Sequence, residues 1–160
     1  MNAPVIDITI NAGEWPEAAE LEPLVHRAIE ATADTGKLRW TDNAELSLLF
    51  TDDSEIAAIN GEWRSKPKPT NVLSFPGADI TPDEVAGPII GDLVFAYETV
   101  AREAKEQQKG FKEHFIHLVV HGFLHLFGYD HEEDAEAEEM ESLERKILAR
   151  LGIADPYSYL

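Results

Sequence analysis

The chain has 160 residues, with 31 acidic against 13 basic side chains and a formal net charge of −18. The length predicts one domain with a sizeable core, and the charge excludes a general polyanion-binding protein because its mean field repels phosphate. No cysteine is present, which excludes disulfide scaffolds, cysteine zinc fingers, iron–sulfur clusters and thiol catalysis. The start lacks a basic flank and an apolar run, and no apolar stretch approaches ~20 residues, so we expect a cytoplasmic protein without signal peptide or membrane span.

Hydrophobic periodicity predicts an α+β protein with strands early and helices late. Strands are expected over residues 5–10, 45–50, 70–75 and 91–95, with a loop over 77–89. Helices are expected over residues 14–32, from about 51–54 to 63, and over 97–109, 111–127 and 132–151. This order predicts a single domain over residues 1–160, in which a small mixed sheet of about four strands packs against helices.

Five of the six histidines fall between positions 114 and 131. His121 and His125 are four residues apart, so one helix face can direct both imidazoles at one ion. Gly128 can adopt a positive φ and fold the chain back, which would let His131 complete a three-histidine site. The spacing predicts one zinc ion per chain on a late helix-turn, with an open fourth position for water.

The remaining histidines fit the metal site less well. His117 and His125 are separated by about 12 Å along a helix, too far to share one ion easily. We therefore expect His114 and His117 to pack or hydrogen-bond near the site, and the isolated His26 to lie at the surface or the edge of the core.

The histidine spacing is also that of zinc peptidases, but one required residue is absent. Those enzymes carry a glutamate base directly after the first histidine, where this chain has Gly122. Two other interpretations of such a site stay open. One is a zinc metallopeptidase-like hydrolase that uses another acid, such as Asp92 or Asp130, and the other is a non-catalytic, zinc-stabilised ribosome-assembly factor.

Three blocks of sequence resemble the YbeY family of bacterial metal-dependent endoribonucleases. They are HGFLHLFGYDH at 121–131, PTNVLSFP at 69–76 together with Arg64, and GDLV at 91–94. Trp63, where tyrosine is expected more often, is a departure, and so is the segment 66–68, which lacks an acidic residue. The resemblance implies a zinc-dependent, single-strand-specific endoribonuclease acting in ribosomal RNA maturation (the small-subunit rRNA 3′ end) and ribosome quality control. The implied partners are single-stranded or ribosomal RNA and the ribosome or small-subunit assembly proteins, with neither DNA nor a membrane.

Arg64 is the candidate phosphate ligand. It begins a locally basic stretch with Lys66 and Lys68 in an otherwise acidic chain, and the alternative for such an arginine is a solvated loop charge. The resemblance favours a functional role, so Arg64 and His121 are the predicted catalytic residues, and His121, His125 and His131 the predicted metal ligands. The nucleophile stays open between water and a 2′-hydroxyl.

Three other features have two interpretations each. Ser74 either lines the cleft or packs. Asp130 has either a role at the metal site, where it would orient an imidazole or hold the metal-bound water, or a structural role as the N-cap of the last helix. The acidic run from Glu132 to Glu144 is expected to be a solvated helix face, with a docking surface for a basic partner as the alternative.

Overall fold

The structure, a computed structural model, describes residues 3–130 and 132–157. Its centre is a sheet in the order β1 (Val5–Ile10), β3 (Glu45–Thr51), β6 (Ile89–Ala96) and β4 (Val72–Pro76). The first three strands are parallel, whereas β4 runs antiparallel to β6. The predicted mixed sheet of four strands is thereby confirmed, and β4 lies at one of its edges.

A short two-stranded ribbon lies beside this sheet. It pairs β2 (Arg39–Trp40) with β5 (Val85–Ala86). The prediction of a continuous loop over 77–89 was wrong at residues 85–86, which form β5. A strand of two residues is too short to produce a period-2 pattern.

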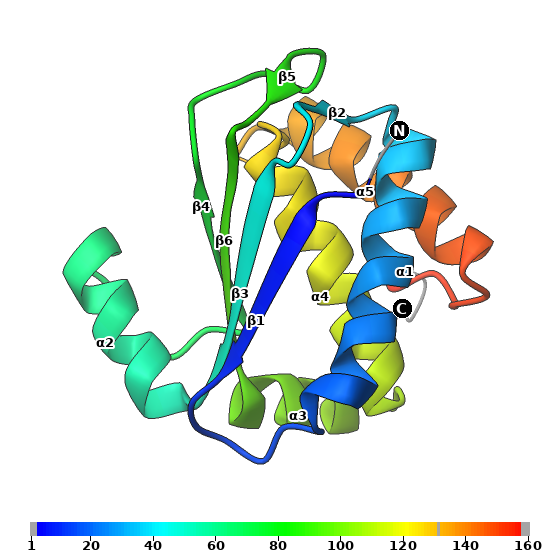
Figure 1. Cartoon of the computed structure of the whole chain (residues 1–160). Helices are drawn as coiled ribbons and strands as arrows, with labels where there is room; N and C mark the ends of the chain where they lie inside the picture. The colour runs from blue at the N-terminus through cyan, green and yellow to red at the C-terminus, as the bar shows by residue number, and fades with distance from the viewer. Residues whose placement is uncertain (1–2, 131, 158–160) are drawn as a thin grey trace.

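Five helices surround the sheet: α1 (Ala18–Gly36), α2 (Asp53–Arg64), α3 (Tyr97–Glu106), α4 (Phe111–Leu126) and α5 (Asp134–Arg150). Figure 1 shows α1, α4 and α5 on one side of the sheet and α2 on the other. The first helix begins four residues later than expected. The Trp15 indole donates a hydrogen bond to the carbonyl of Thr51 at 2.8 Å, which holds the preceding segment against the end of β3.

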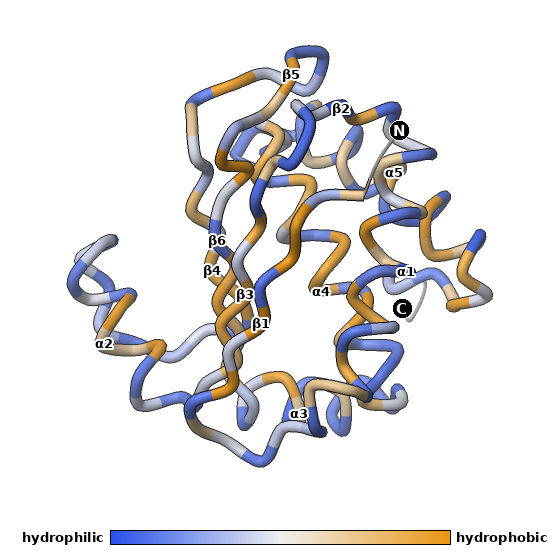
Figure 2. The backbone as a smooth tube through the Cα atoms, viewed as in Figure 1, coloured by the Kyte–Doolittle hydropathy of each residue, from blue (hydrophilic) through white to orange (hydrophobic). Residues whose placement is uncertain are grey.

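The core lies between the sheet and α4. Hydrophobic residues are concentrated along the strands and α4 (Figure 2). Phe50 on β3 and Phe95 on β6 stack with ring centroids 5.2 Å apart, and Phe115 of α4 packs against both. This packing fixes α4, and hence the histidines on its neighbouring face, relative to the sheet. No described helix has both the length and the apolar character needed to cross a bilayer.

Candidate active site

Helix α4 directs the imidazoles of His121 and His125 at each other. Their Nε2 atoms are 3.1 Å apart. The other ring nitrogens have separate partners: His121 Nδ1 lies 3.1 Å from the Glu144 carboxylate, and His125 Nδ1 lies 2.8 Å from the carbonyl oxygen of Tyr129. Both partners are acceptors, so each Nδ1 carries the proton and donates it.

This arrangement fits a bound cation. When Nδ1 carries the proton, the Nε2 atom of a neutral imidazole presents a lone pair. Two lone pairs that face each other across 3.1 Å repel unless a positive charge lies between them. Nitrogen ligands at 2.0–2.1 Å from a tetrahedral zinc are separated by about 3.3 Å, close to what is observed. Metal-bound histidines also usually donate their other N–H to a carboxylate or a carbonyl, as His121 and His125 do.

The third predicted ligand, His131, lies outside the described residues. Among residues 3–130 and 132–157, no group of three or more His, Asp or Glu side chains is arranged to hold a metal ion. The structure therefore brings two of the three predicted ligands together, and the complete zinc site stays a prediction.

Gly128 makes the predicted chain reversal after α4. Its φ is +97°, and a Cβ at this position would lie 2.2 Å from the carbonyl oxygen of Ile80. Only glycine avoids both the strained backbone and this contact. The turn places the carbonyl oxygen of Tyr129 on His125, as described above, and Asp130 in the lining of the cavity over the histidines.

Gly122 explains why no glutamate follows the first histidine. A Cβ here would lie 2.9 Å from Leu93 Cδ2 and 3.4 Å from Ser74 Oγ, and the Ser74 hydroxyl donates to the carbonyl of Gly122 at 3.3 Å. Position 122 is thus packed against the sheet. A glutamate base of the zinc-peptidase kind does not fit there.

Glu144 of α5 is the site residue that the sequence reasoning missed. It was expected on a solvated helix face, but only 1% of its surface is exposed. Its carboxylate accepts hydrogen bonds from His117 Nε2 at 3.2 Å, from His121 Nδ1 and from the Tyr157 hydroxyl at 2.9 Å. Burial alone would raise its pKa, but the hydrogen bonds from His117 and His121 outweigh burial and lower the pKa to about 2. One signal was present in the sequence: Glu144 interrupts the apolar stripe of Met140, Ile147 and Leu148.

A cavity of about 700 Å³ opens over the two histidines. Arg64 lines it together with His121 and His125, so the structure brings these three predicted site residues to one place. Its wall comes from β4, from the loop before β4 and from the turn after α4, with the following polar members: Lys66, Thr70, Asn71, Ser74, Asp79, Tyr129, Asp130 and Glu132. Ser74 therefore both lines the cavity and bonds to α4. Asp130 does not cap α5, whose N-cap is Glu133.

Arg64 lies across the outer edge of β4. Its Nη2 donates to the carbonyl of Ser74 at 2.9 Å, and its guanidinium carbon is 5.6 Å from the centre of the Phe75 ring. The side chain is exposed and anchored, which suits a group that contacts a phosphate.

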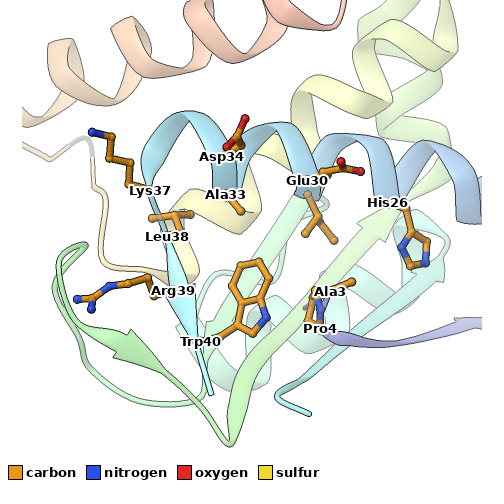
Figure 3. Close-up of a pocket in the computed structure, with 11 residues that line it drawn as sticks. Ala3, Pro4, His26, Glu30, Ala33, Asp34, Lys37, Leu38, Arg39 and Trp40 are labelled. Atoms are coloured by element: carbon orange, nitrogen blue, oxygen red, sulfur yellow. The ribbon is translucent and has the colours of Figure 1, made fainter. Parts of the chain in front are cut away.

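The other histidines take structural positions. His114 Nε2 lies 2.9 Å from Glu103, and His117 is bonded to Glu144 as described above, which confirms hydrogen bonding near the site. His26 lies 3.8 Å from Glu22, with 43% of its side chain exposed. Figure 3 shows it at a second cavity of about 700 Å³ between α1 and β2, which contains none of the predicted site residues.

Comparison with known proteins places these residues in a family context. The family model "Endoribonuclease YbeY" matches residues 7–152. The chain is 54% identical to the endoribonuclease YbeY of Sinorhizobium fredii, over 98% of this chain and 94% of that protein. It is 55% identical to that of Rhizobium meliloti, over 98% and 96%. Its fold is similar to the solution structure of TM1509 from Thermotoga maritima, with a TM-score of 0.57, 25% identity and 92% of each chain covered.

Proposed function

Because the chain belongs to the endoribonuclease YbeY family, we propose that it is a zinc-dependent endoribonuclease specific for single-stranded RNA. We place its activity in ribosomal RNA maturation, at the 3′ end of the small-subunit rRNA, and in ribosome quality control. Its partners would be the ribosome or small-subunit assembly proteins, and its location the cytoplasm.

One observation supports the zinc-dependent chemistry more than any other. The Nε2 atoms of His121 and His125 converge to 3.1 Å in the cavity that Arg64 also lines. Two imidazoles whose other nitrogens are held by a carboxylate and a carbonyl are suited to bind a metal, and His131 follows as the proposed third ligand.

The residues around the cavity have different roles in the proposed cleavage of the phosphodiester. Glu144 and the Tyr129 carbonyl hold the histidine rings in the tautomer in which Nε2 carries no proton. The Arg64 guanidinium stabilises the negative charge that develops on the phosphate oxygens. A bound zinc ion would supply a Lewis acid at the same phosphate.

The alternative of a metallopeptidase is less well supported. The position of the usual glutamate base is Gly122, packed against Leu93 and Ser74. Asp130 lines the cavity and Asp92 does not, so a peptidase mechanism would have to use Asp130. A non-catalytic assembly factor gives no reason for an arginine to face the histidine site across an open cavity.

A cleavage assay tests the proposal. Unstructured RNA, duplex RNA and casein are incubated with the protein, with and without a chelator, and zinc content is measured in parallel. We expect cleavage of the unstructured RNA alone, abolished by the chelator. Cleavage of casein, or of RNA at an unchanged rate after complete metal removal, would contradict the proposal.

Two variants assign the roles within that assay. His121→Ala should lose zinc and lower the melting temperature, because metal binding contributes to folding. Arg64→Ala should keep zinc and the fold but cleave about 100- to 1,000-fold more slowly, as for the loss of one transition-state donor. Arg27→Ala, at an exposed arginine of α1, is the matched control and should behave as wild type.

A further inference from the structure

The face of the sheet opposite α4 carries an exposed tryptophan that packs on a half-buried phenylalanine beside the site. Trp63, at the end of α2, has 69% of its surface exposed, the highest fraction among the large hydrophobic side chains described as exposed. Its ring lies edge-on to Phe75 of β4, with centroids 6.4 Å apart. Such exposure of a tryptophan has no structural benefit, because burial of this side chain would stabilise the fold.

This pair borders a mostly apolar groove of about 440 Å³ on the open face of the sheet. Trp63 and Phe75 form part of its wall together with Leu49 and Val94, and Asp92 adds a carboxylate. Among the described residues, no cationic side chain lines the groove. Uncharged, flat groups therefore suit it better than phosphates, which Asp92 would repel.

Arg64 connects the groove to the catalytic cavity. Its guanidinium lies over the Phe75 ring, which lines the groove, while Arg64 itself lines the cavity of His121 and His125. The edge of β4 thus separates the groove from the cavity, and the Arg64 side chain extends across this edge. A nucleic-acid strand with a phosphate on Arg64 would have its neighbouring base within reach of Phe75 and Trp63.

We propose that Trp63, supported edge-on by Phe75, forms a stacking platform for an unpaired base of the RNA substrate, next to the phosphate held by Arg64. The inference rests on the proposed function and adds a binding site to it. With a net charge of −18, the protein gains little RNA affinity from its general field. Base–aromatic stacking supplies affinity without charge and acts only on unpaired bases. The platform thereby gives a physical basis for selecting single-stranded RNA.

Binding measurements on the zinc-loaded full chain, with 2′-O-methyl probes that resist cleavage, test the platform separately from cleavage. The probes are a fluorescein-labelled 12-nucleotide oligoadenylate and an abasic oligonucleotide of the same length, followed by anisotropy. Trp63→Leu should weaken oligoadenylate binding by about fivefold to a hundredfold, the range for loss of one stacked base. It should leave abasic binding unchanged. Trp63→Phe should retain most of the affinity, because it keeps an aromatic face.

The controls separate the possible results. Val85→Ala truncates another exposed apolar side chain, on β5, which Figure 1 shows at the other end of the sheet from α2, and should bind as wild type. The platform proposal is wrong if Trp63→Leu binds oligoadenylate as tightly as wild type does. It is also wrong if this variant loses affinity for both probes by the same factor. If the wild type binds neither probe, the proposed function itself fails, and the platform with it.

Discussion

Glu144 determines the protonation of His121. A carboxylate inside the protein with three hydrogen-bond donors around it stays ionised, so the ring nitrogen of His121 that faces it carries a proton. This forces the His121 proton onto Nδ1 and leaves Nε2 facing His125. The same carboxylate also accepts hydrogen bonds from His117 and Tyr157. One residue of α5 therefore holds three polar side chains in place next to the site.

Replacing this carboxylate by its amide tests that role. Glu144→Gln places an N–H₂ group against the donors of His117 and His121, so one of these contacts is lost. We expect zinc affinity to fall about 10- to 100-fold, the usual effect of changing a residue that orients a metal ligand. Competition with a chromophoric chelator measures the affinity. Glu138→Gln, at an exposed position of the same helix, should leave it unchanged, and equal affinity in the two variants would disprove the role.

Gly128 offers a second test at the scale of one residue, with a matched control in the chain. Gly128→Ala adds a methyl group 2.2 Å from Ile80 O at a φ of +97°, whereas Gly152→Ala meets nothing within 4 Å at a φ of +74°. Both changes strain the backbone, but only the first also creates a clash. We expect Gly128→Ala to lower the free energy of unfolding by about 1–3 kcal/mol more than Gly152→Ala. Urea denaturation of both variants measures this difference, and equal losses would show that the Ile80 contact is unimportant.

At the scale of elements, Glu103 joins three parts of the fold. Its carboxylate on α3 accepts from His114 of α4 at 2.9 Å and from Asn71, just before β4, at 3.0 Å. Burial alone would raise the pKa of Glu103, but these hydrogen bonds, with the charges of His114 and Arg102, lower it below the ordinary value of 4.5. The contact holds the beginning of β4, and thus one wall of the cavity, against α4.

This lowered pKa has a consequence for acid stability. A carboxyl group whose pKa is lower in the folded state stabilises the fold above its ordinary pKa and loses that contribution as the pH falls through its folded value. Wild type should therefore be more stable than Glu103→Gln at neutral pH, and the difference should disappear in acid. Melting temperatures from pH 7 down to pH 3 test this. A difference independent of pH would contradict it, and Glu106→Gln, at an exposed position of α3, is the control.

The sequence predicted the elements better than their arrangement. Alternation and helical spacing are local properties of the sequence. The ends of β1, β3, α4 and α5 therefore lie within two residues of the expected positions. The order β1-β3-β6-β4 and the ribbon of β2 and β5 depend on contacts between distant segments, which local periodicity does not encode. The same distinction holds for the site. The spacing of His121 and His125 on one helix was readable, whereas Glu144 reaches His121 only through the packing of α5 on α4.

For the whole molecule, charge limits how RNA can bind. Only two cations, Arg64 and Lys66, are among the described residues that line the cavity over His121 and His125, and Asp79, Asp130 and Glu132 line it as well. Affinity for a polyanion must then come from a few local contacts, because a field from a net charge of −18 opposes approach.

A salt titration measures this limit. For single strands, each neutralised phosphate contributes a slope of about −0.7 to log affinity against log salt. Phosphate contacts from Arg64 and Lys66 predict a slope of about −1.4 for an oligonucleotide that fills the cavity. Lys66→Ala should reduce the magnitude of this slope by about 0.7. A slope steeper than about −4 would show an extended basic track and contradict the local arrangement.

The hydrogen bond from Arg64 to the Ser74 carbonyl also bears on self-association. The outer side of an edge strand is a template on which another chain can add a strand, and proteins protect such edges with charged side chains. At β4, the charged side chain that bonds to the edge is Arg64, which also lines the cavity of His121 and His125. If Arg64 contacts a phosphate as proposed, its loss would expose the Ser74 carbonyl for strand addition and remove a phosphate ligand together, so aggregation and RNA binding would change at one position.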